Sequence, residues 1–270
     1  MQKRTAYCEN PICSLAVLSV MGDRTDQQDD FGYMLDDERS LIIVCDGMGG
    51  HEGGRLASNA AVNRFILQYK SAPKNYEIIP FLEECTALAN ADVLNLKTAS
   101  GEKLNAGSTL VAVMLDSSRN LYWNSVGDSR LYLFRDGDFA QITQDHNYTT
   151  VLLEKLNAGM IDREEFNSEN LKGEALISFL GISGSPLVDY NNLPLPLLPG
   201  DRLVIMSDGL YKVLPDADIL NIVNNFSNVN ETAMALEIKA EKTATKNGIS
   251  RDNTTIAVSY THLRAHETLM

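Results

Sequence analysis

Five aspartates of this 270-residue chain stand where expected strands begin or end, and several lie beside glycine: Asp29, Asp46, Asp128, Asp208 and Asp252. Carboxylates fixed at strand ends, with glycine leaving room for backbone and water, are ligands that hard divalent cations prefer. Cys8 and Cys13 have no second cysteine or histidine pair at the spacing of a zinc site. The pattern therefore predicts a Mg²⁺ or Mn²⁺ site with oxygen ligands from distant segments.

A single Asp-Gly pair is weak evidence, because such pairs commonly mark turns. We interpret Asp136-Gly137 in that way, as the turn of a β-hairpin. Asp46 differs, because the apolar run 41–45 precedes it and three of the next four residues are glycine. That is more glycine than a turn needs, so Asp46 is the strongest candidate ligand.

Arg24 lies five residues upstream of Asp29. From there its planar guanidinium could bind two oxygens of a phosphate beside the metal ions. Spacing alone favours the alternative, a solvated arginine on the surface.

The composition excludes several classes of protein. Lys plus Arg is 23 and Asp plus Glu is 36, which gives a formal net charge of −13. A nucleic-acid binder or a protein that docks on anionic membranes needs a basic surface instead. We find no apolar run long enough to span a membrane and no secretory signal, so we expect a cytoplasmic protein with reduced cysteines.

Short apolar and β-prone runs alternate with helical segments in the order strands, helices, strands, helices. This order predicts one α+β domain with antiparallel sheets, not repeated βαβ units. Residues 261–270 lack periodicity, and we expect a non-native or disordered tail there. The expected strands are 15–20, 31–35, 41–45, 109–115, 121–125, 131–135, 139–142, 203–207 and 254–259, and the expected helices are 55–70, 79–96, 149–158, 216–225 and 231–246.

An ordered set of short motifs resembles the metal-dependent protein phosphatase family, also called the PPM or type 2C phosphatases. Each motif is weak alone, but their order over residues 12–260 is specific, and we expect one PPM-type domain there. The motifs are Gly22-Asp23-Arg24 with Gln28-Asp29, Asp46-Gly47-Met48-Gly49-Gly50-His51, Gly107-Ser108-Thr109, Gly127-Asp128-Ser129-Arg130, Pro199-Gly200-Asp201, Ser207-Asp208-Gly209 and Asp252-Asn253-Thr254.

The resemblance implies a four-layer α-β-β-α sandwich, in which helix pairs flank two antiparallel sheets. It also implies hydrolysis of phosphoserine and phosphothreonine in proteins by a water activated between two Mn²⁺ or Mg²⁺ ions. Carried over by position, Asp46 bridges both ions and the Gly47 carbonyl helps to hold one. Asp208 and Asp252 complete the first metal site.

Three further positions take roles from the same resemblance. Asp29 belongs to the shell of the second ion, and Asp128 binds a possible third ion together with Asp208. Arg24 corresponds to the arginine that grips the phosphate, which replaces the surface interpretation above. Asp46, Asp208 and Arg24 are therefore the predicted catalytic residues.

The chain departs from the family pattern in three places. Gln27 stands where bacterial members usually carry asparagine, and Gln28 where others carry glutamate or glutamine, and we expect little effect. Met48 stands where animal members carry a histidine proposed as general acid, and methionine cannot donate a proton. Residues 146–190 correspond to a variable flap, and their sequence 175–181 lacks the arginine that many relatives carry there.

We predict a metal-dependent protein serine/threonine phosphatase that acts as a monomer on phosphorylated proteins, opposing a cognate serine/threonine kinase. We expect neither nucleic acid nor membrane as a partner. Two alternatives remain at this point: a catalytically silent member that binds phosphoproteins, and a metal-dependent hydrolase of small phosphate esters.

Overall fold

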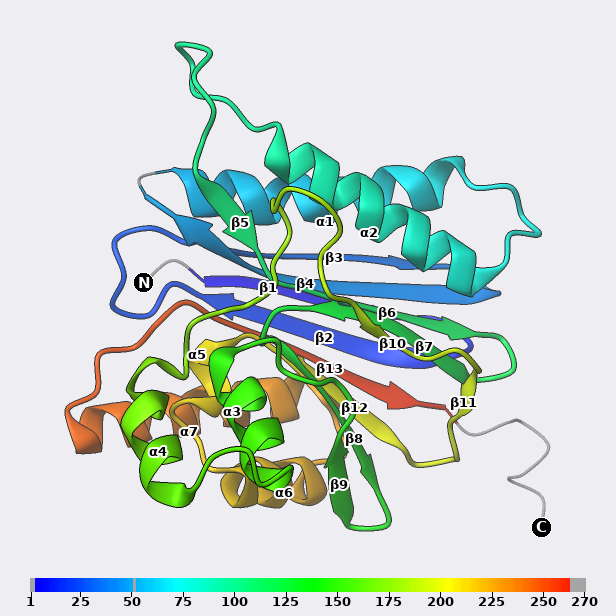
Figure 1. Cartoon of the computed structure of the whole chain (residues 1–270). Coiled ribbons are helices and arrows are strands. Elements are labelled where there is room, and N and C mark those ends of the chain that lie inside the picture. The colour runs from blue at the N-terminus through cyan, green and yellow to red at the C-terminus, as the bar shows by residue number, and fades with distance from the viewer. Residues whose placement is uncertain (1–2, 51, 263–270) are drawn as a thin grey trace.

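Two antiparallel β-sheets lie face to face in the computed structural model, and a pair of helices covers the outer face of each (Figure 1). The structure describes residues 3–50 and 52–262. The predicted α+β class and the four-layer sandwich are confirmed. No described helix combines the length and the apolar character that crossing a bilayer requires.

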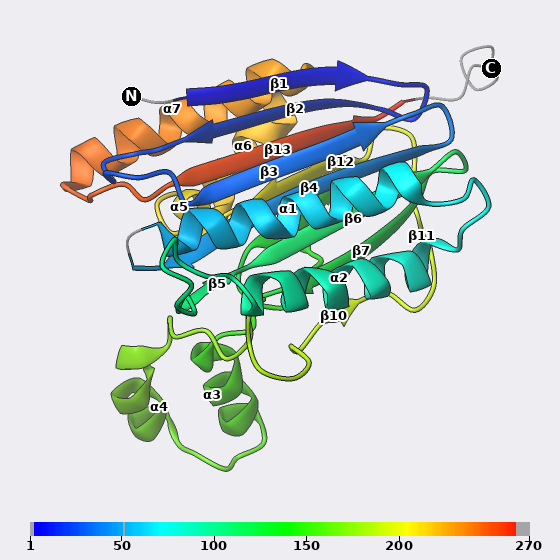
Figure 2. The same cartoon turned by 90° about the horizontal axis from the view of Figure 1, so that it is seen from above.

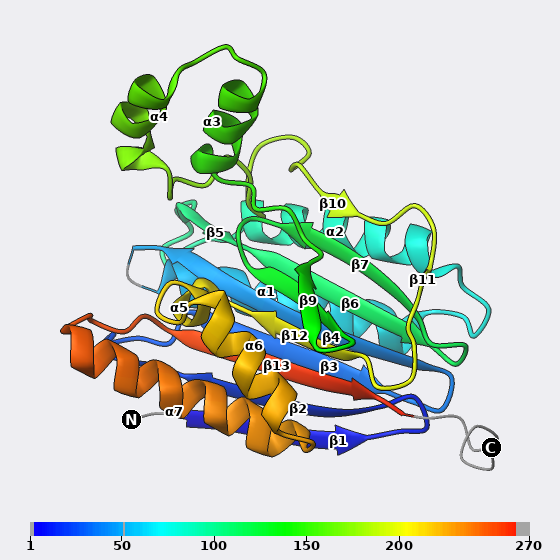
Figure 3. The ribbon, with the colours of Figure 1, turned by 90° about the horizontal axis from the view of Figure 1, so that it is seen from below.

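The first sheet has six strands in the order β1-β2-β13-β12-β8-β9. Helices α6 (Asp216–Asn225) and α7 (Val229–Asn247) cover its outer face (Figure 3). Its strands are β1 (Lys3–Glu9), β2 (Cys13–Val20), β8 (Arg130–Arg135), β9 (Asp138–Gln141), β12 (Arg202–Met206) and β13 (Thr254–Thr261).

The second sheet has seven strands, five of them in the order β10-β7-β6-β4-β3. Strand β5 pairs with β4, and β11 pairs with β7. Helices α1 (Gly53–Ser71) and α2 (Ile78–Leu94) cover its outer face (Figure 2). Its strands are β3 (Asp29–Leu35), β4 (Arg39–Gly49), β5 (Ala106–Ser108), β6 (Leu110–Asp116), β7 (Asn120–Val126), β10 (Asp189–Tyr190) and β11 (Leu195–Pro196).

The expected flap contains small helices that stand to one side of the sandwich (Figure 2). These are α3 (Tyr148–Asn157), α4 (Arg163–Glu169) and the 3₁₀ turn η1 (Asn170–Lys172). One further short helix, α5 (Asp208–Tyr211), follows β12.

Strand β4 shows why its apolar run is continuous. Successive side chains of a strand point to opposite faces. Ile42 and Val44 pack between the two sheets, whereas Leu41, Ile43 and Cys45 pack against α1 and α2. A strand buried on both faces needs apolar residues at every position, and this one supplies them.

The folded region is longer at both ends than the sequence predicts. Strand β1 pairs along β2, so the ordered structure includes residues before the predicted domain start at residue 12. The expected tail also begins too early. Thr261 is the last residue of β13, and the backbone N–H of His262 donates to the carbonyl of Ile12 at 3.0 Å. Residues 263–270 of that expected tail lie outside the described residues.

Candidate metal centre

The candidate site lies at one end of the layer between the two sheets. On β4, Ile42 and Val44 face the opposite sheet, and the alternation of side chains puts Asp46 next on that face. Asp29 begins β3 and lies directly opposite Asp46 in the strand register. The inner faces of these two strands are therefore apolar along their length and acidic at this end.

The first sheet supplies the remaining carboxylates from positions where its strands start or stop. Asp208 is the first residue of α5, directly after β12 and its extended N-cap residue Ser207. Asp252 immediately precedes β13. Asp128 lies in the loop from β7 to β8, where the chain passes from one sheet to the other. The two sheets thus share the acidic site.

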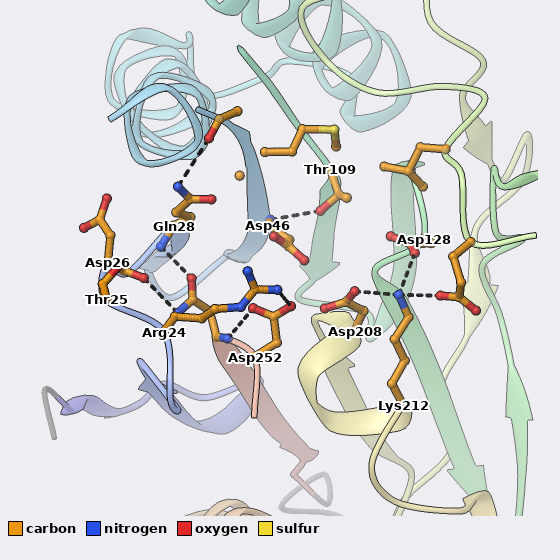
Figure 4. A pocket seen from close by; sticks show the side chains of 16 residues that line it. Arg24, Thr25, Asp26, Gln28, Asp46, Thr109, Asp128, Asp208, Lys212 and Asp252 are labelled. Carbon is orange, nitrogen blue, oxygen red and sulfur yellow. Dashed lines mark hydrogen bonds and ion pairs between the residues drawn. The ribbon is translucent and has the colours of Figure 1, made fainter. Parts of the chain in front are cut away.

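A cavity of about 380 Å³ opens at this end of the sandwich. In Figure 4 the side chains of Asp46, Asp208 and Asp252 point toward one another. Six of the seven residues singled out from the sequence line the cavity, namely Arg24, Asp46, Gly47, Asp128, Asp208 and Asp252. The seventh, Asp29, is almost fully buried beside Asp46.

Burial and mutual repulsion disfavour negative charge on several of these carboxyls. Burial, with smaller contributions from the carboxylates of Asp208 and Asp252, raises the pKa of Asp29 to about 7. Burial also raises the pKa of Asp46 well above its ordinary value, together with the charge of Asp29. The pKa of Asp128 rises to about 6 for the same kind of reason. A divalent cation bound among these carboxylates would offset their repulsion.

Two buried oxygens of the cluster lack a hydrogen-bond partner among the described residues, Asp29 Oδ1 and Asp208 Oδ1. Buried polar atoms are normally satisfied, so unpartnered carboxylate oxygens indicate a missing ligand. Oxygen donors from acidic side chains and backbone are the donor set that Mn²⁺ and Mg²⁺ take. The residues present therefore fit these ions.

Two basic side chains contact the carboxylates directly. Arg24 Nη2 donates to Asp252 Oδ2 at 2.6 Å, and the arginine side chain is 60% exposed. Lys212 Nζ donates to Asp208 Oδ2 at 2.8 Å (Figure 4). Among residues 3–50 and 52–262, no group of three or more acidic, histidine or cysteine side chains is already arranged to enclose a metal ion.

The glycines of the motifs permit close backbone contacts around the site. A Cβ at Gly47 would collide with the carbonyl oxygen of Gly54, and one at Gly209 would collide with that of Asn253. Glycine at both positions lets β4 approach α1 and lets α5 approach the segment before β13. The carbonyl of Gly47 as a metal ligand stays a prediction.

Several site residues were not predicted as such. Ser207 donates to Asp29 Oδ2 at 2.7 Å, and Thr109 Oγ1 accepts the backbone N–H of Asp46 at 2.9 Å. Ser207 and Thr109 both belong to motifs quoted above, but their positions in the sequence do not indicate these contacts. Lys212 could have been found, because a lysine four residues after an aspartate in a helical turn faces it. Glu174, which contacts Lys212 from the flap segment, had no sequence signal.

Met48 and Leu176 also line the cavity. The first confirms that the position discussed above faces the site with a side chain that cannot donate a proton. The second places the flap segment at the rim of the cavity, as expected from its position in the sequence.

Comparisons with known proteins find similar sequences and similar solved structures. Residues 21–240 match the protein phosphatase 2C family. The serine/threonine phosphatase stp of Listeria innocua is 30% identical over 207 residues, which make up 76% of this chain and 79% of the Listeria protein.

Two solved structures are similar over nearly the whole chain. The PPM Ser-Thr phosphatase MsPP from Mycobacterium smegmatis, solved with cacodylate, is 29% identical with a TM-score of 0.71 and covers 92% of this chain and 97% of its own. The catalytic domain of the serine/threonine protein phosphatase PstP, solved with two manganese ions, is 25% identical with a TM-score of 0.74. That match covers 93% of this chain and 99% of the other.

Proposed function

The chain belongs to the protein phosphatase 2C family, and from that membership we propose that Asp46, Asp208 and Asp252 hold two divalent cations for phosphate-ester hydrolysis. The chain is a metal-dependent protein serine/threonine phosphatase, and its cofactors are Mn²⁺ or Mg²⁺. The observation that carries the assignment of residues is the shared cavity, which these three carboxylates enter from both sheets.

The role of each proposed metal ligand follows from its position in the cavity. Asp46 enters between the two sheets, which suits it to bridge both ions, and Gly47 lines the cavity beside it. Asp208 and Asp252 complete one ion site, and the buried Asp29 supports the other. The predicted third ion at Asp128 is a separate question, because Lys212 already lies near that carboxylate.

Two divalent cations bound in this cavity would supply a nucleophile from water at neutral pH and would offset charge on the phosphoryl oxygens. Arg24 binds the same phosphoryl group with its planar guanidinium. To do so it exchanges Asp252 for phosphate oxygens, and its exposed side chain leaves it free to move. Met48 gives no proton to the leaving serine or threonine oxygen, so that proton comes from solvent in the cavity.

The substrate follows from the same membership. We expect phosphoserine and phosphothreonine proteins, the targets of a cognate kinase, because the similar Listeria protein is named a serine/threonine phosphatase. The open cavity at the rim of the sandwich admits an extended phosphorylated segment. A cytoplasmic location, a monomeric state and a PPM-type domain over residues 12–260 complete the proposal.

Hydrolysis of a phosphothreonine peptide and of an aryl phosphate, each with Mn²⁺ and with chelator, tests this function. We expect turnover of both compounds with Mn²⁺ and none with chelator. Turnover of the aryl ester without the peptide would instead identify a small-ester hydrolase. A protein that binds Mn²⁺ but turns over neither compound would be a silent binding member.

A further inference from the structure

The ammonium group of Lys212 lies among three carboxylates at one end of the candidate metal centre. Its Nζ is 2.8 Å from Asp208 Oδ2, 2.5 Å from Glu174 Oε2 and 3.9 Å from Asp128 Oδ2. Figure 4 shows Lys212 reaching between Asp208 and Asp128. These two aspartates are the pair that the family resemblance assigns to a third divalent ion.

The partners of Lys212 differ in what they contribute. The Glu174 side chain is 74% exposed, and an exposed ion pair contributes little to holding a lysine in place. The side chains of Asp128 and Asp208 are only 6% and 16% exposed, so their charges are poorly solvated. Lys212 is therefore held mainly by the two buried aspartates, which need a nearby cation.

The backbone around Lys212 fixes this arrangement. The N–H of Lys212 donates to the carbonyl of Asp208 at 3.0 Å, which places its side chain one helical turn from that carboxylate. The hydroxyl of the preceding residue, Tyr211, donates to the carbonyl of Asp128 at 2.9 Å. The Arg130 guanidinium stacks 3.6 Å from the centre of the Tyr211 ring. These contacts tie the loop of Asp128 to the turn that carries Lys212.

We infer that Lys212 is the resident cation between Asp128 and Asp208, so that this chain binds two divalent ions and excludes a third. An ammonium group and a divalent ion cannot occupy the same space beside Asp208, and their like charges repel. The inference rests on the proposed function, since it presumes the two ions held by Asp46, Asp208 and Asp252. It changes the predicted role of Asp128 from metal ligand to partner of Lys212.

The number of Mn²⁺ ions bound per chain, measured by equilibrium dialysis with electron paramagnetic resonance of free Mn²⁺, tests the inference. We expect two ions for the wild type and three for Lys212→Met, because removal of the ammonium frees both aspartates. Lys212→Met combined with Asp128→Asn should return to two. Lys212→Arg should keep two, because it retains the positive charge.

Two controls separate the site from general effects of charge. Lys239→Met removes a lysine that pairs with Asp218 at 3.3 Å on α6 and α7, outside the cavity, and should leave two ions. Glu174→Gln should also leave two, since the buried aspartates hold Lys212.

Three bound ions in the wild type would overturn the inference but not the proposed function. This measurement uses only the wild-type protein, so it does not depend on whether a variant folds. An unchanged count of two in folded Lys212→Met would overturn it as well. No bound Mn²⁺ in the wild type would overturn the proposed function, and the inference with it.

Discussion

At the scale of single residues, the site is a set of carboxyl groups brought closer together than their charges favour. Asp29 and Asp46 are opposite each other on neighbouring strands, and both are deeply buried. Their raised pKa values indicate that these carboxyls bind protons more tightly than an ordinary aspartate does. Binding of a divalent cation releases those protons, so the affinity for metal rises with pH.

The pKa of Asp29 gives a prediction for the metal-free protein. Its folded value is about 7, against an ordinary 3.8, so the folded state holds the proton more tightly than the unfolded state. The resulting stability is fully present below the unfolded pKa and is lost as pH rises through the folded value. The free energy of unfolding in chelator should therefore fall between about pH 4 and pH 7. Urea titrations of the wild type and of Asp29→Asn check this.

Asp29→Asn should show a weaker decline over the same range, because asparagine does not titrate. Equal slopes for the two proteins would mean that the pKa of Asp29 is not raised by folding.

Arg24 gives a prediction for substrate binding. Replacing it with alanine removes charged hydrogen bonds to phosphate, which are worth about 1.5–3 kcal/mol. We expect kcat/KM for a phosphothreonine peptide to fall roughly tenfold to a hundredfold. Arg24→Lys should recover only part of this, since lysine lacks the planar fork.

The matched control is Arg64→Ala, which removes an arginine that pairs with Asp92 through two contacts of 2.6 and 2.8 Å. It should leave kcat/KM unchanged. A loss of equal size in both variants would show that Arg24 acts only through the overall charge.

At the scale of elements, the sequence predicts the helices and strands that bury one face, because burial gives their apolar residues a regular spacing. The apolar runs predict β4, β6 and β12, and the repeated spacing predicts α1 and α2 within a few residues. The helix expected at 231–246 matches α7 equally well. The hairpin at Asp136-Gly137 is confirmed, and both residues have the positive φ that such a turn requires. The local sequence pattern determines where these elements form more than long-range packing does.

The missed elements lack a local pattern. Strand β1 is a mostly exposed edge strand, so its residues show no apolar alternation, and only pairing with β2 makes it a strand. Strand β4 does not stop at Cys45 but continues to Gly49, because β5 pairs with its glycine-rich end. Helix α5 is a single turn, too short for periodicity. Asp46, the strongest candidate ligand, therefore lies within a strand instead of after one.

The same reasoning explains what could be predicted of the site. Asp46, Asp208 and Asp252 stood out because each adjoins an apolar strand, and the cavity contains all three. Ser207 and Glu174 did not stand out in the sequence, because their contacts depend on how separate elements pack together.

Ser207 gives a prediction at this scale, since its hydroxyl links three strands. It donates to Asp29 on β3 and accepts the N–H of Thr255 on β13, while its own residue follows β12. Ser207→Ala leaves both buried partners without their hydrogen bond to this hydroxyl. This loss should lower the free energy of unfolding by about 1–3 kcal/mol. It should also weaken Mn²⁺ binding, because the pKa of Asp29 rises without that hydrogen bond.

Chemical denaturation and calorimetric Mn²⁺ titration measure these two effects. Ser71→Ala, which removes an exposed hydroxyl at the end of α1, is the control and should change neither quantity. Unaltered Mn²⁺ binding in Ser207→Ala would remove Ser207 from the support of the metal centre.

At the scale of the whole molecule, the candidate metal centre lies between the two halves of the sandwich. Asp29 and Asp46 come from the sheet that α1 and α2 cover, whereas Asp208 and Asp252 come from the sheet that α6 and α7 cover. An ion bound to both sets holds the two sheets together at that end. Metal binding should therefore stabilise the fold as a whole.

Thermal unfolding measures this coupling. A ligand at a hundred times its dissociation constant stabilises the folded state by about 2.7 kcal/mol, which raises the Tm by roughly 5–10 °C in a chain of this size. We expect such a rise when Mn²⁺ is added to chelator-treated protein, and almost none in Asp46→Asn. An equal rise in both proteins would show that Mn²⁺ binds elsewhere.

The central claim is that one cavity at the end of the two sheets holds a pair of divalent ions on Asp46, Asp208 and Asp252. Anomalous diffraction at the manganese edge, from crystals grown with Mn²⁺, tests it most directly. We predict two neighbouring peaks in this cavity, with Asp46 in contact with both. Peaks only outside the cavity, or none in a crystal of the Mn²⁺-saturated protein, would contradict the claim.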